Sequence, residues 1–426
     1  MEVLMYISNE EIFFVDYEKD SEKIIIYAPL RSYMALISKK NMEIFLSDST
    51  SDVRKMLMGK ITNRPLIDVN KILSDLQRVT QELSIPITDD CNLRCTYCHA
   101  SAGEEHKKES MDEVMIDSIL KCYFNNINEN TENVKINFTG GGEPTYEFNK
   151  LSYAINKAKD IASQRNIKCA FTMATNGCYG QDIREYITRN FSEVSLSFDG
   201  TSHIQNLHRP FANGHPSFEH VYATAKYFYE VKFPFALRST ISDYSLNYLE
   251  EIIDFFEHNF PGVHLGLEPL IVVGRAIRNT IIKAPDAKKF GDELIKVFDY
   301  TDKKNIDIAN SAASEYTIVR PVFCSGVGIP NWTVLMTGEI VCCSRDGAPD
   351  EFTFGRLNFK DSTVFIDEFK LNNIRNMNVL SYDQCADCFA KYHCAGDCPD
   401  RRLSSKSDCD SLKKVGQFIL NKKINA

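Results

Sequence analysis

The chain has 426 residues, 43% of them apolar and 25% charged, which is ordinary for a globular protein with a sizeable core and two or three domains. A formal net charge of −9 disfavours a general nucleic-acid surface, and no apolar run reaches the ~20 residues that a membrane helix needs. The N-terminal stretch lacks the basic residues of a signal peptide, so the fourteen cysteines favour metal ligation in the cytoplasm over disulfide bonds.

Residues 1–80 are predicted to form a separate N-terminal domain. Short apolar stretches predict strands at 11–16 and 23–28, and helical patterns follow at 52–58 and 69–80. We expect either an extension packed on the main domain or a small winged-helix-like module. A module of that kind would offer a strand edge to a peptide, such as the leader of a precursor.

Residues 81–310 alternate between strand-like runs and helical segments such as 111–125 and 246–258. The predicted strands are 85–89, 134–139, 169–174, 194–199, 235–240 and 263–268. Six strand–helix units in series predict an α/β fold with a parallel sheet, curled into a partial (β/α)6 TIM-like barrel. Ligands of such a fold bind at the C-terminal ends of the strands.

Residues 311–426 form the third predicted domain. Eight of the fourteen cysteines lie between Cys324 and Cys409, among few long periodic segments. Metal ligation is therefore expected to organise this region, which we interpret as a cysteine-rich iron–sulfur domain.

Cys91, Cys95 and Cys98 are spaced C-x3-C-x2-C on one loop. Three thiolates suit three corners of a [4Fe–4S] cube and leave its fourth iron open to a substrate or cofactor. The run that ends in His99 also matches the C-x-x-C-H attachment site of c-type haem, but that reading leaves Cys91 without a role. A zinc site is another alternative, although it would want a fourth ligand.

A glycine run, Gly140-Gly141-Gly142-Glu143, follows the second predicted strand of the barrel. Glycines let the backbone approach a ligand closely, and a carboxylate beside them can accept hydrogen bonds from an ammonium group. By itself a triple glycine is more often a tight turn. Its place one strand after the three cysteines favours a binding site.

Together these motifs resemble the radical S-adenosylmethionine (radical SAM) enzymes, from about residue 84 onward. The resemblance implies that Cys91, Cys95 and Cys98 hold a [4Fe–4S] cluster whose open iron binds S-adenosyl-L-methionine, which is cleaved to a 5′-deoxyadenosyl radical. It further implies that the Gly140–Glu143 run contacts the methionine ammonium. The residues expected to touch the ribose or carboxylate are Asn176, Ser197 and Arg238. No catalytic acid or base is identified.

The later cysteines resemble the seven-cysteine SPASM extension found on many radical SAM enzymes. The pattern comprises Cys324, Cys343, Cys385, Cys388, Cys394, Cys398 and Cys409. The resemblance implies two auxiliary [4Fe–4S] clusters, which makes three in all. The outer one would be held by Cys385, Cys388, Cys394 and Cys409, and the inner one by Cys324, Cys343 and Cys398. A pair of structural zinc knuckles is the alternative.

The inner cluster is expected to keep an open iron. Relatives with a fully ligated inner cluster carry an extra cysteine shortly after the first, whereas residues 327–330 here contain no ligand type. Cys342 could fill that position instead. An open iron would bind the thiolate of a substrate cysteine and lower its pKa.

Enzymes with this extension mostly modify peptides. We therefore expect a maturase of a ribosomally made peptide that forms a thioether crosslink, with a precursor peptide and an electron donor such as flavodoxin or ferredoxin as partners. The alternatives are a carbon–carbon crosslinking maturase and an anaerobic sulfatase-maturing enzyme. Sulfatase maturation is disfavoured by Ser344, which stands where those enzymes carry an aspartate, although Asp346 lies close by. An enzyme acting on a small metabolite and a non-catalytic iron–sulfur electron carrier are further alternatives.

Overall fold

The structure, a computed structural model, describes residues 2–7, 10–79, 82–105, 108–127, 130–313, 316, 318–328, 331–345, 348, 350–403 and 408–425. The chain divides into two compact units. The terminal unit comprises Met1–Val79, Ser311–Gly328 and Arg375–Ala426, and the barrel unit comprises Thr80–Asn310 and Ile329–Ile374. Among the described residues, no helix combines the length and the apolar character that a membrane crossing requires.

The terminal unit contains a four-stranded antiparallel sheet in the order β1-β2-β3-β4. Its strands are β1 (Glu2–Ile7), β2 (Glu10–Asp16), β3 (Lys23–Ala28) and β4 (Tyr33–Ser38). Its helices are α1 (Lys39–Ser47), α2 (Asp52–Thr62), α3 (Val69–Val79), α12 (Lys391–Cys394), α13 (Pro399–Leu403) and α14 (Cys409–Lys423). The strands predicted at 11–16 and 23–28 and the two predicted helices are confirmed.

Both faces of this sheet are covered, which explains the continuous apolar run of β3. Ile12 and Phe14 of β2 face one side and pack in one cluster with Phe45 of α1. Phe13 faces the other side and packs with Leu420 of α14. The N-terminal sheet and the last helix of the chain thus share one core.

The barrel unit is built on an 11-stranded sheet in the order β11-β10-β9-β8-β7-β6-β5-β12-β13-β14-β15, counted over the described residues. Its first strands are β5 (Glu82–Ser84), β6 (Asn133–Phe138), β7 (Lys168–Thr175), β8 (Glu193–Ser197), β9 (Phe235–Ile241), β10 (His264–Pro269) and β11 (Asp307–Ala309). These are parallel to one another, so the predicted α/β parallel sheet is confirmed. The helices are α4 (Glu113–Asn126), α5 (Phe148–Gln164), α6 (Gln181–Asn190), α7 (Ser202–His208), α8 (Phe218–Glu230), α9 (Leu249–Asn259), α10 (Ala287–Tyr300) and α11 (Glu368–Arg375).

Residues 329–374 extend this sheet. Strand β12 (Trp332–Val334) pairs in parallel with β5, and the antiparallel strands β13 (Glu339–Val341), β14 (Thr353–Asn358) and β15 (Thr363–Ile366) follow it. This part of the predicted third domain therefore continues the barrel sheet, while residues 375–426 belong to the terminal unit.

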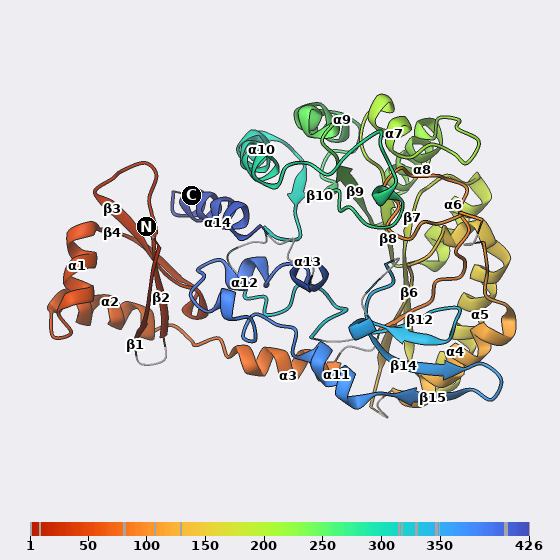
Figure 1. The fold of residues 1–426 in the computed structure, drawn as a ribbon, viewed down its shortest axis with the longest axis horizontal. Helices are drawn as coiled ribbons and strands as arrows, with labels where there is room; N and C mark the ends of the chain where they lie inside the picture. The colour runs from red at the N-terminus through yellow and green to blue at the C-terminus, as the bar shows by residue number, and fades with distance from the viewer. Residues whose placement is uncertain are drawn as a thin grey trace. The chain divides into compact units, whose positions relative to one another are not determined.

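Side chains alternate between the two sides of the parallel strands. The helices of the barrel unit, such as α4 to α9, cover one of these sides (Figure 1). On β6, Val134, Ile136 and Phe138 are buried, as is Leu151 of the neighbouring α5. On β8 and β9 the opposite side carries Ser197 and Arg238, which are paired in register and are less buried. The polar side chains predicted to bind a ligand thus lie on the side of the sheet that the helices do not cover.

One predicted strand is misplaced. The first barrel strand is Glu82–Ser84, not 85–89. Residues Thr88 and Asp89 leave the sheet and bond to Ser110 and Glu109 instead. Pro86 has no N–H to donate to a ladder, which favours an early end of the strand.

Candidate active site

The residues that lead from β5 to the first cysteine are held by the glycine run. The amide of Gly142 donates to the Thr88 carbonyl at 2.6 Å, and that of Glu143 donates to the Asp90 carbonyl at 3.0 Å. A Cβ atom on Gly142 would lie 1.8 Å from the Asp90 oxygen, so only glycine permits this contact. The glycine run was predicted to approach a ligand closely. At Gly142 the close contact is instead with the backbone of Asp90, the residue before Cys91.

Gly140 and Gly141 have φ angles of +107° and +71°, in the region that favours glycine. A Cβ atom on Gly140 would lie 2.6 Å from Oγ of Ser344. The structure thus places the residue after Cys343 beside the glycine run. Asp346 lies outside the described residues.

Glu143 connects the glycine run to the end of β7. Its carboxylate is buried, and Oε1 accepts hydrogen bonds from the hydroxyls of Thr145 at 2.7 Å and Thr175 at 2.8 Å. Oε2 accepts the backbone N–H of Asn176 at 2.7 Å. Burial raises the pKa of Glu143, against the opposing effect of the hydrogen bonds from Asn176 and Thr145. The predicted contact with a methionine ammonium stays a prediction.

Asn176 lies between this carboxylate and the first cysteine. Its side-chain amide donates to Oδ1 of Asn92 at 2.8 Å and lies 3.6 Å from Sγ of Cys91. The Asn92 amide in turn donates to the Cys178 carbonyl at 2.9 Å. The tertiary structure thus brings together three predicted site residues, Cys91, Glu143 and Asn176, and Asn176 contacts the other two.

Taken as whole residues, Cys91, Cys95 and Cys98 are half-buried. Backbone amides point at two of the sulfurs, that of Leu93 at Cys91 and that of Ala102 at Cys98, each at 3.4 Å. Such N–H donors stabilise thiolates and the clusters that they hold. Burial raises the pKa of the Cys95 thiol to about 11, and the positive charge of Arg209 opposes that rise. Forming a buried thiolate therefore costs free energy. Metal ligation, which deprotonates a thiol outright, would supply it.

Arg275 also holds the cysteine loop, a role that its place in the sequence did not reveal. Its guanidinium donates to the carbonyls of Cys95 at 2.8 Å and Ala102 at 2.6 Å, and its backbone N–H donates to the Cys98 carbonyl at 2.9 Å. Glu104 pairs with the same guanidinium at 3.1 Å. The only sequence signal for this contact was its position shortly after the sixth barrel strand.

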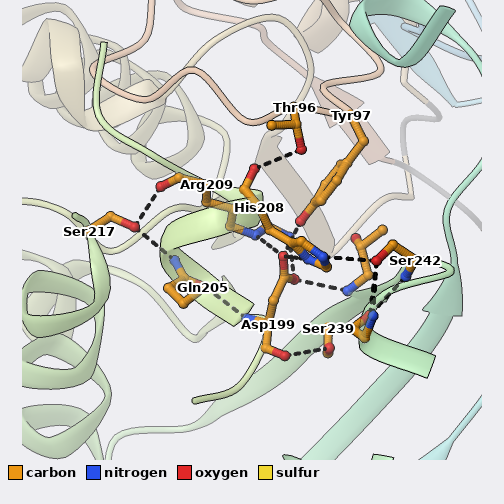
Figure 2. Close-up of polar contacts among 11 residues, drawn as sticks. Thr96, Tyr97, Asp199, Gln205, His208, Arg209, Ser217, Ser239 and Ser242 are labelled. Carbon is orange, nitrogen blue, oxygen red and sulfur yellow. Dashed lines mark hydrogen bonds and ion pairs between the residues drawn. The ribbon is translucent and has the colours of Figure 1, made fainter. Parts of the chain in front are cut away.

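A buried polar network centred on Asp199 supports the loop from behind, and it too was missed (Figure 2). Asp199 is fully buried and pairs through both oxygens with Arg209 at 3.0 Å. It also accepts hydrogen bonds from His208 Nδ1 at 3.0 Å and from the Tyr97 hydroxyl. Burial acts to raise the pKa of Asp199, but the charge of Arg209 and the bond from His208 outweigh it, so the pKa is lowered.

The network is coupled to the loop between the second and third cysteines. The Arg209 guanidinium lies 5.2 Å from the centre of the Tyr97 ring, a cation–π distance. The Thr96 amide donates to the His208 carbonyl at 2.8 Å. Residues 96 and 97 are therefore fixed by groups that lie after β8.

Arg238 and Ser197 remain candidates for ligand contact. The Arg238 side chain is exposed, and among the described residues its guanidinium makes no hydrogen bond or ion pair. A cation on the open side of a barrel strand is available to bind an anionic group such as a carboxylate.

Four cysteines of the terminal unit line one cavity of about 220 Å³. They are Cys385, Cys388, Cys394 and Cys409, the set that the resemblance assigns to the outer cluster. Elsewhere in the described part of the chain, as here, no three His, Cys, Asp or Glu groups gather closely enough to hold a single metal ion. Thiols spread around a cavity fit a polynuclear cluster, whose ligands bind different irons.

The three cysteines assigned to the inner cluster are divided between the units. Cys324 and Cys398 belong to the terminal unit and Cys343 to the barrel unit. Cys342 is partly exposed, and its backbone N–H donates to Phe352 at 2.9 Å. Residues 329 and 330, where a further ligand was sought, lie outside the described residues.

Residues 85–256 match the family model of the radical SAM superfamily. The chain is 30% identical over 179 residues to an uncharacterised protein of Methanocaldococcus jannaschii, a match that spans 41% of this chain and 58% of that relative. It is 22% identical over 359 residues to the cysteine-type anaerobic sulfatase-maturating enzyme of Clostridium perfringens, which covers 80% of this chain and 96% of that enzyme.

Two solved structures share the fold. Native anSMEcpe with bound AdoMet superposes with a TM-score of 0.62 at 18% identity and covers 81% of this chain and 98% of its own. Streptococcus suis SuiB bound to precursor peptide SuiA has a TM-score of 0.54 at 15% identity, over 96% and 98% of the two chains.

Residues 85–256 thus form a radical SAM domain, and the chain is a radical SAM enzyme whose cofactors are S-adenosylmethionine and [4Fe–4S] clusters. The alternative of a non-catalytic electron carrier is set aside.

Proposed function

We propose that this radical SAM enzyme modifies a ribosomally made peptide and forms a thioether crosslink from a substrate cysteine. The observation that carries the proposal is the loop of Cys91, Cys95 and Cys98, which Arg275 and the Asp199 network hold and which Asn176 joins to Glu143. Three ligands leave one iron of the cluster for S-adenosylmethionine. When bound, the cluster and this cofactor supply the electron and the hydrogen-abstracting radical.

The chain's own residues would position the cysteine loop and orient S-adenosylmethionine. Arg275 and the Asp199 network hold the loop so that the three sulfurs keep one arrangement. Glu143 and Asn176 would bind the ammonium of the methionine group, and Arg238 its carboxylate. Ser197, the register partner of Arg238, would contact the ribose.

The two auxiliary cluster sites would take part in modifying the peptide. Cys385, Cys388, Cys394 and Cys409 would hold the outer cluster in the cavity that they line. Cys324, Cys343 and Cys398 would hold the inner cluster, which would supply a binding place for the substrate thiolate and a first acceptor for one electron. Carbon–sulfur bond formation removes the thiol proton and one hydrogen atom from the neighbouring carbon, so the product is lighter by one H2.

The N-terminal sheet would hold the leader of the precursor. Strand β4 is at the edge of its sheet, with Met34 to Ser38 only partly buried. An edge strand can accept an extended peptide as a further strand. Tethering through a leader raises the effective concentration of the core peptide at the site. SuiB, solved with a precursor peptide, supports a peptide substrate.

Sulfatase maturation is the second candidate. It is favoured by the similarity to the Clostridium perfringens enzyme over most of the chain. The hydroxyl of Ser344, next to the glycine run, stands against it because a serine is a far weaker base than the aspartate that the resemblance expects there.

Two assays test these proposals. Reduced, reconstituted enzyme should convert S-adenosylmethionine to 5′-deoxyadenosine, and Cys98→Ala should abolish this. Cys122→Ala, which alters a buried thiol on α4 bonded to the Ser362 carbonyl, should retain it. A cysteine-containing precursor peptide encoded beside the enzyme should then lose one H2. An unchanged precursor with normal cofactor cleavage would refute the thioether proposal, and conversion of a sulfatase-derived peptide instead would favour the second candidate.

A further inference from the structure

Arg402 of α13 lies against the cavity that the four cysteines line. Its Nη2 donates to Sγ of Cys385 at 3.0 Å. Nη1 donates to Oε1 of Gln384 at 3.1 Å, and Nε donates to the Gly396 carbonyl. The guanidinium also stacks over the Tyr382 ring at 4.5 Å. It is therefore held in one orientation, with one N–H directed at a sulfur.

No carboxylate among the described residues neutralises the charge of Arg402, since its hydrogen-bond partners are a thiol, a side-chain amide and a backbone carbonyl. Lys391, another cation of the same cavity wall, is different because it is buried and paired with Glu11 at 2.8 Å. Arg402 thus contributes to the cavity a positive charge that no described carboxylate neutralises.

A hydrogen bond from a cation to a ligand sulfur favours the reduced state of a cluster, because that state carries more negative charge. Reduction adds an electron that is spread over iron and sulfur, and an N–H⁺ donor stabilises that added charge. Hydrogen bonds to the sulfurs and local net charge are main determinants of cluster potential.

We propose that Arg402 is a positioning residue that raises the reduction potential of the cluster held by Cys385, Cys388, Cys394 and Cys409. The outer cluster thereby becomes the final acceptor of the one electron that carbon–sulfur bond formation releases. That electron would enter the inner cluster first and pass on to the outer one, which goes from its oxidised to its one-electron-reduced state. This inference rests on the outer cluster of the proposed function.

The test uses the full-length chain with the other two clusters removed, by replacing Cys91, Cys95, Cys98 and Cys343 with alanine. Iron content and an EPR-monitored redox titration are measured for this parent and for four variants made in it. We expect Arg402→Met to titrate at a clearly more negative potential than the parent. Arg402→Lys, which keeps the charge, should shift less.

Lys413→Met is the matched control because Lys413 lines the same cavity. Its shift should be smaller than that of Arg402→Met, and equal shifts would overturn the role of the N–H to sulfur contact. Should Arg402→Met lose iron, Arg402→Gln gives the comparison, since it removes the charge and keeps a donor.

The outcomes distinguish failure of the proposed outer cluster from failure of the proposed role of Arg402. A parent that binds no iron would refute the outer cluster itself, and with it this part of the proposed function. A parent and Arg402 variants that all bind iron and titrate at one potential would refute only the inference about Arg402. A purely structural role would change iron retention without moving the potential.

Discussion

Replacing Asp199 with asparagine tests whether the buried network supports the cysteine loop. The substitution keeps the shape of the side chain and removes the negative charge that faces Arg209, which is 8% exposed. Breaking a buried ion pair in this way leaves an uncompensated charge and costs about 3–5 kcal/mol. For a unit of this size, at about 1.7 °C per kcal/mol, that corresponds to a fall in Tm of roughly 5–9 °C.

The sign of the pH dependence follows from the direction of the pKa shift. The pKa of Asp199 is lowered on folding, so its stabilising effect is fully present above the ordinary carboxyl pKa of about 3.9. It is lost as the pH falls through the folded pKa. The full difference between wild type and Asp199→Asn is therefore expected at neutral pH.

The assay is anaerobic thermal unfolding by circular dichroism, combined with iron content and 5′-deoxyadenosine yield. Asp199→Asn should unfold at lower temperature and produce less 5′-deoxyadenosine, because Thr96 and Tyr97 lose their support. The double variant Asp199→Asn/Arg209→Met removes the unpaired cation and should recover part of the lost Tm. An Asp199→Asn protein with wild-type Tm and wild-type cofactor cleavage would refute the reasoning.

Three further predictions concern the site itself. Gly142→Ala should reduce S-adenosylmethionine binding at least tenfold, on the order of 1.4 kcal/mol, because its Cβ would lie 1.8 Å from the Asp90 oxygen; Gly59→Ala, on a helix with nothing within 4 Å, is the control and should leave binding unchanged. Arg238→Gln should raise the Kd for S-adenosylmethionine or the KM for the peptide with no change in Tm, and unchanged constants for both would remove Arg238 from the site. In the iron-free protein, alkylation of Cys95 should be slow at neutral pH and rise toward a pH of about 11, since burial raises its pKa and only the thiolate reacts; a rate that levels off near pH 8 would contradict this.

The sequence by itself determined the chemistry that depends on local spacing. Cys91, Cys95 and Cys98 lie on one loop, and Cys385, Cys388 and Cys394 lie within one short segment, so their separations along the chain limit their separations in space. The parallel sheet could also be predicted from the sequence, because apolar runs alternate with helical patterns over long stretches. The glycine run was recognised for the same reason, although at Gly142 the close contact proved to be with Asp90.

Only the tertiary structure decided how these local motifs are supported. Arg275 reaches the cysteine loop from a position about 180 residues away, and Asp199 joins Tyr97 to Arg209 across separate strand ends. Arg402 donates to a sulfur 17 positions earlier. Isolated arginines and aspartates carry no periodic or spacing signal, because nothing in a one-dimensional pattern records which distant group will share their burial. Contacts of this kind form when the chain folds, since buried charges are stable only where a partner is brought to them.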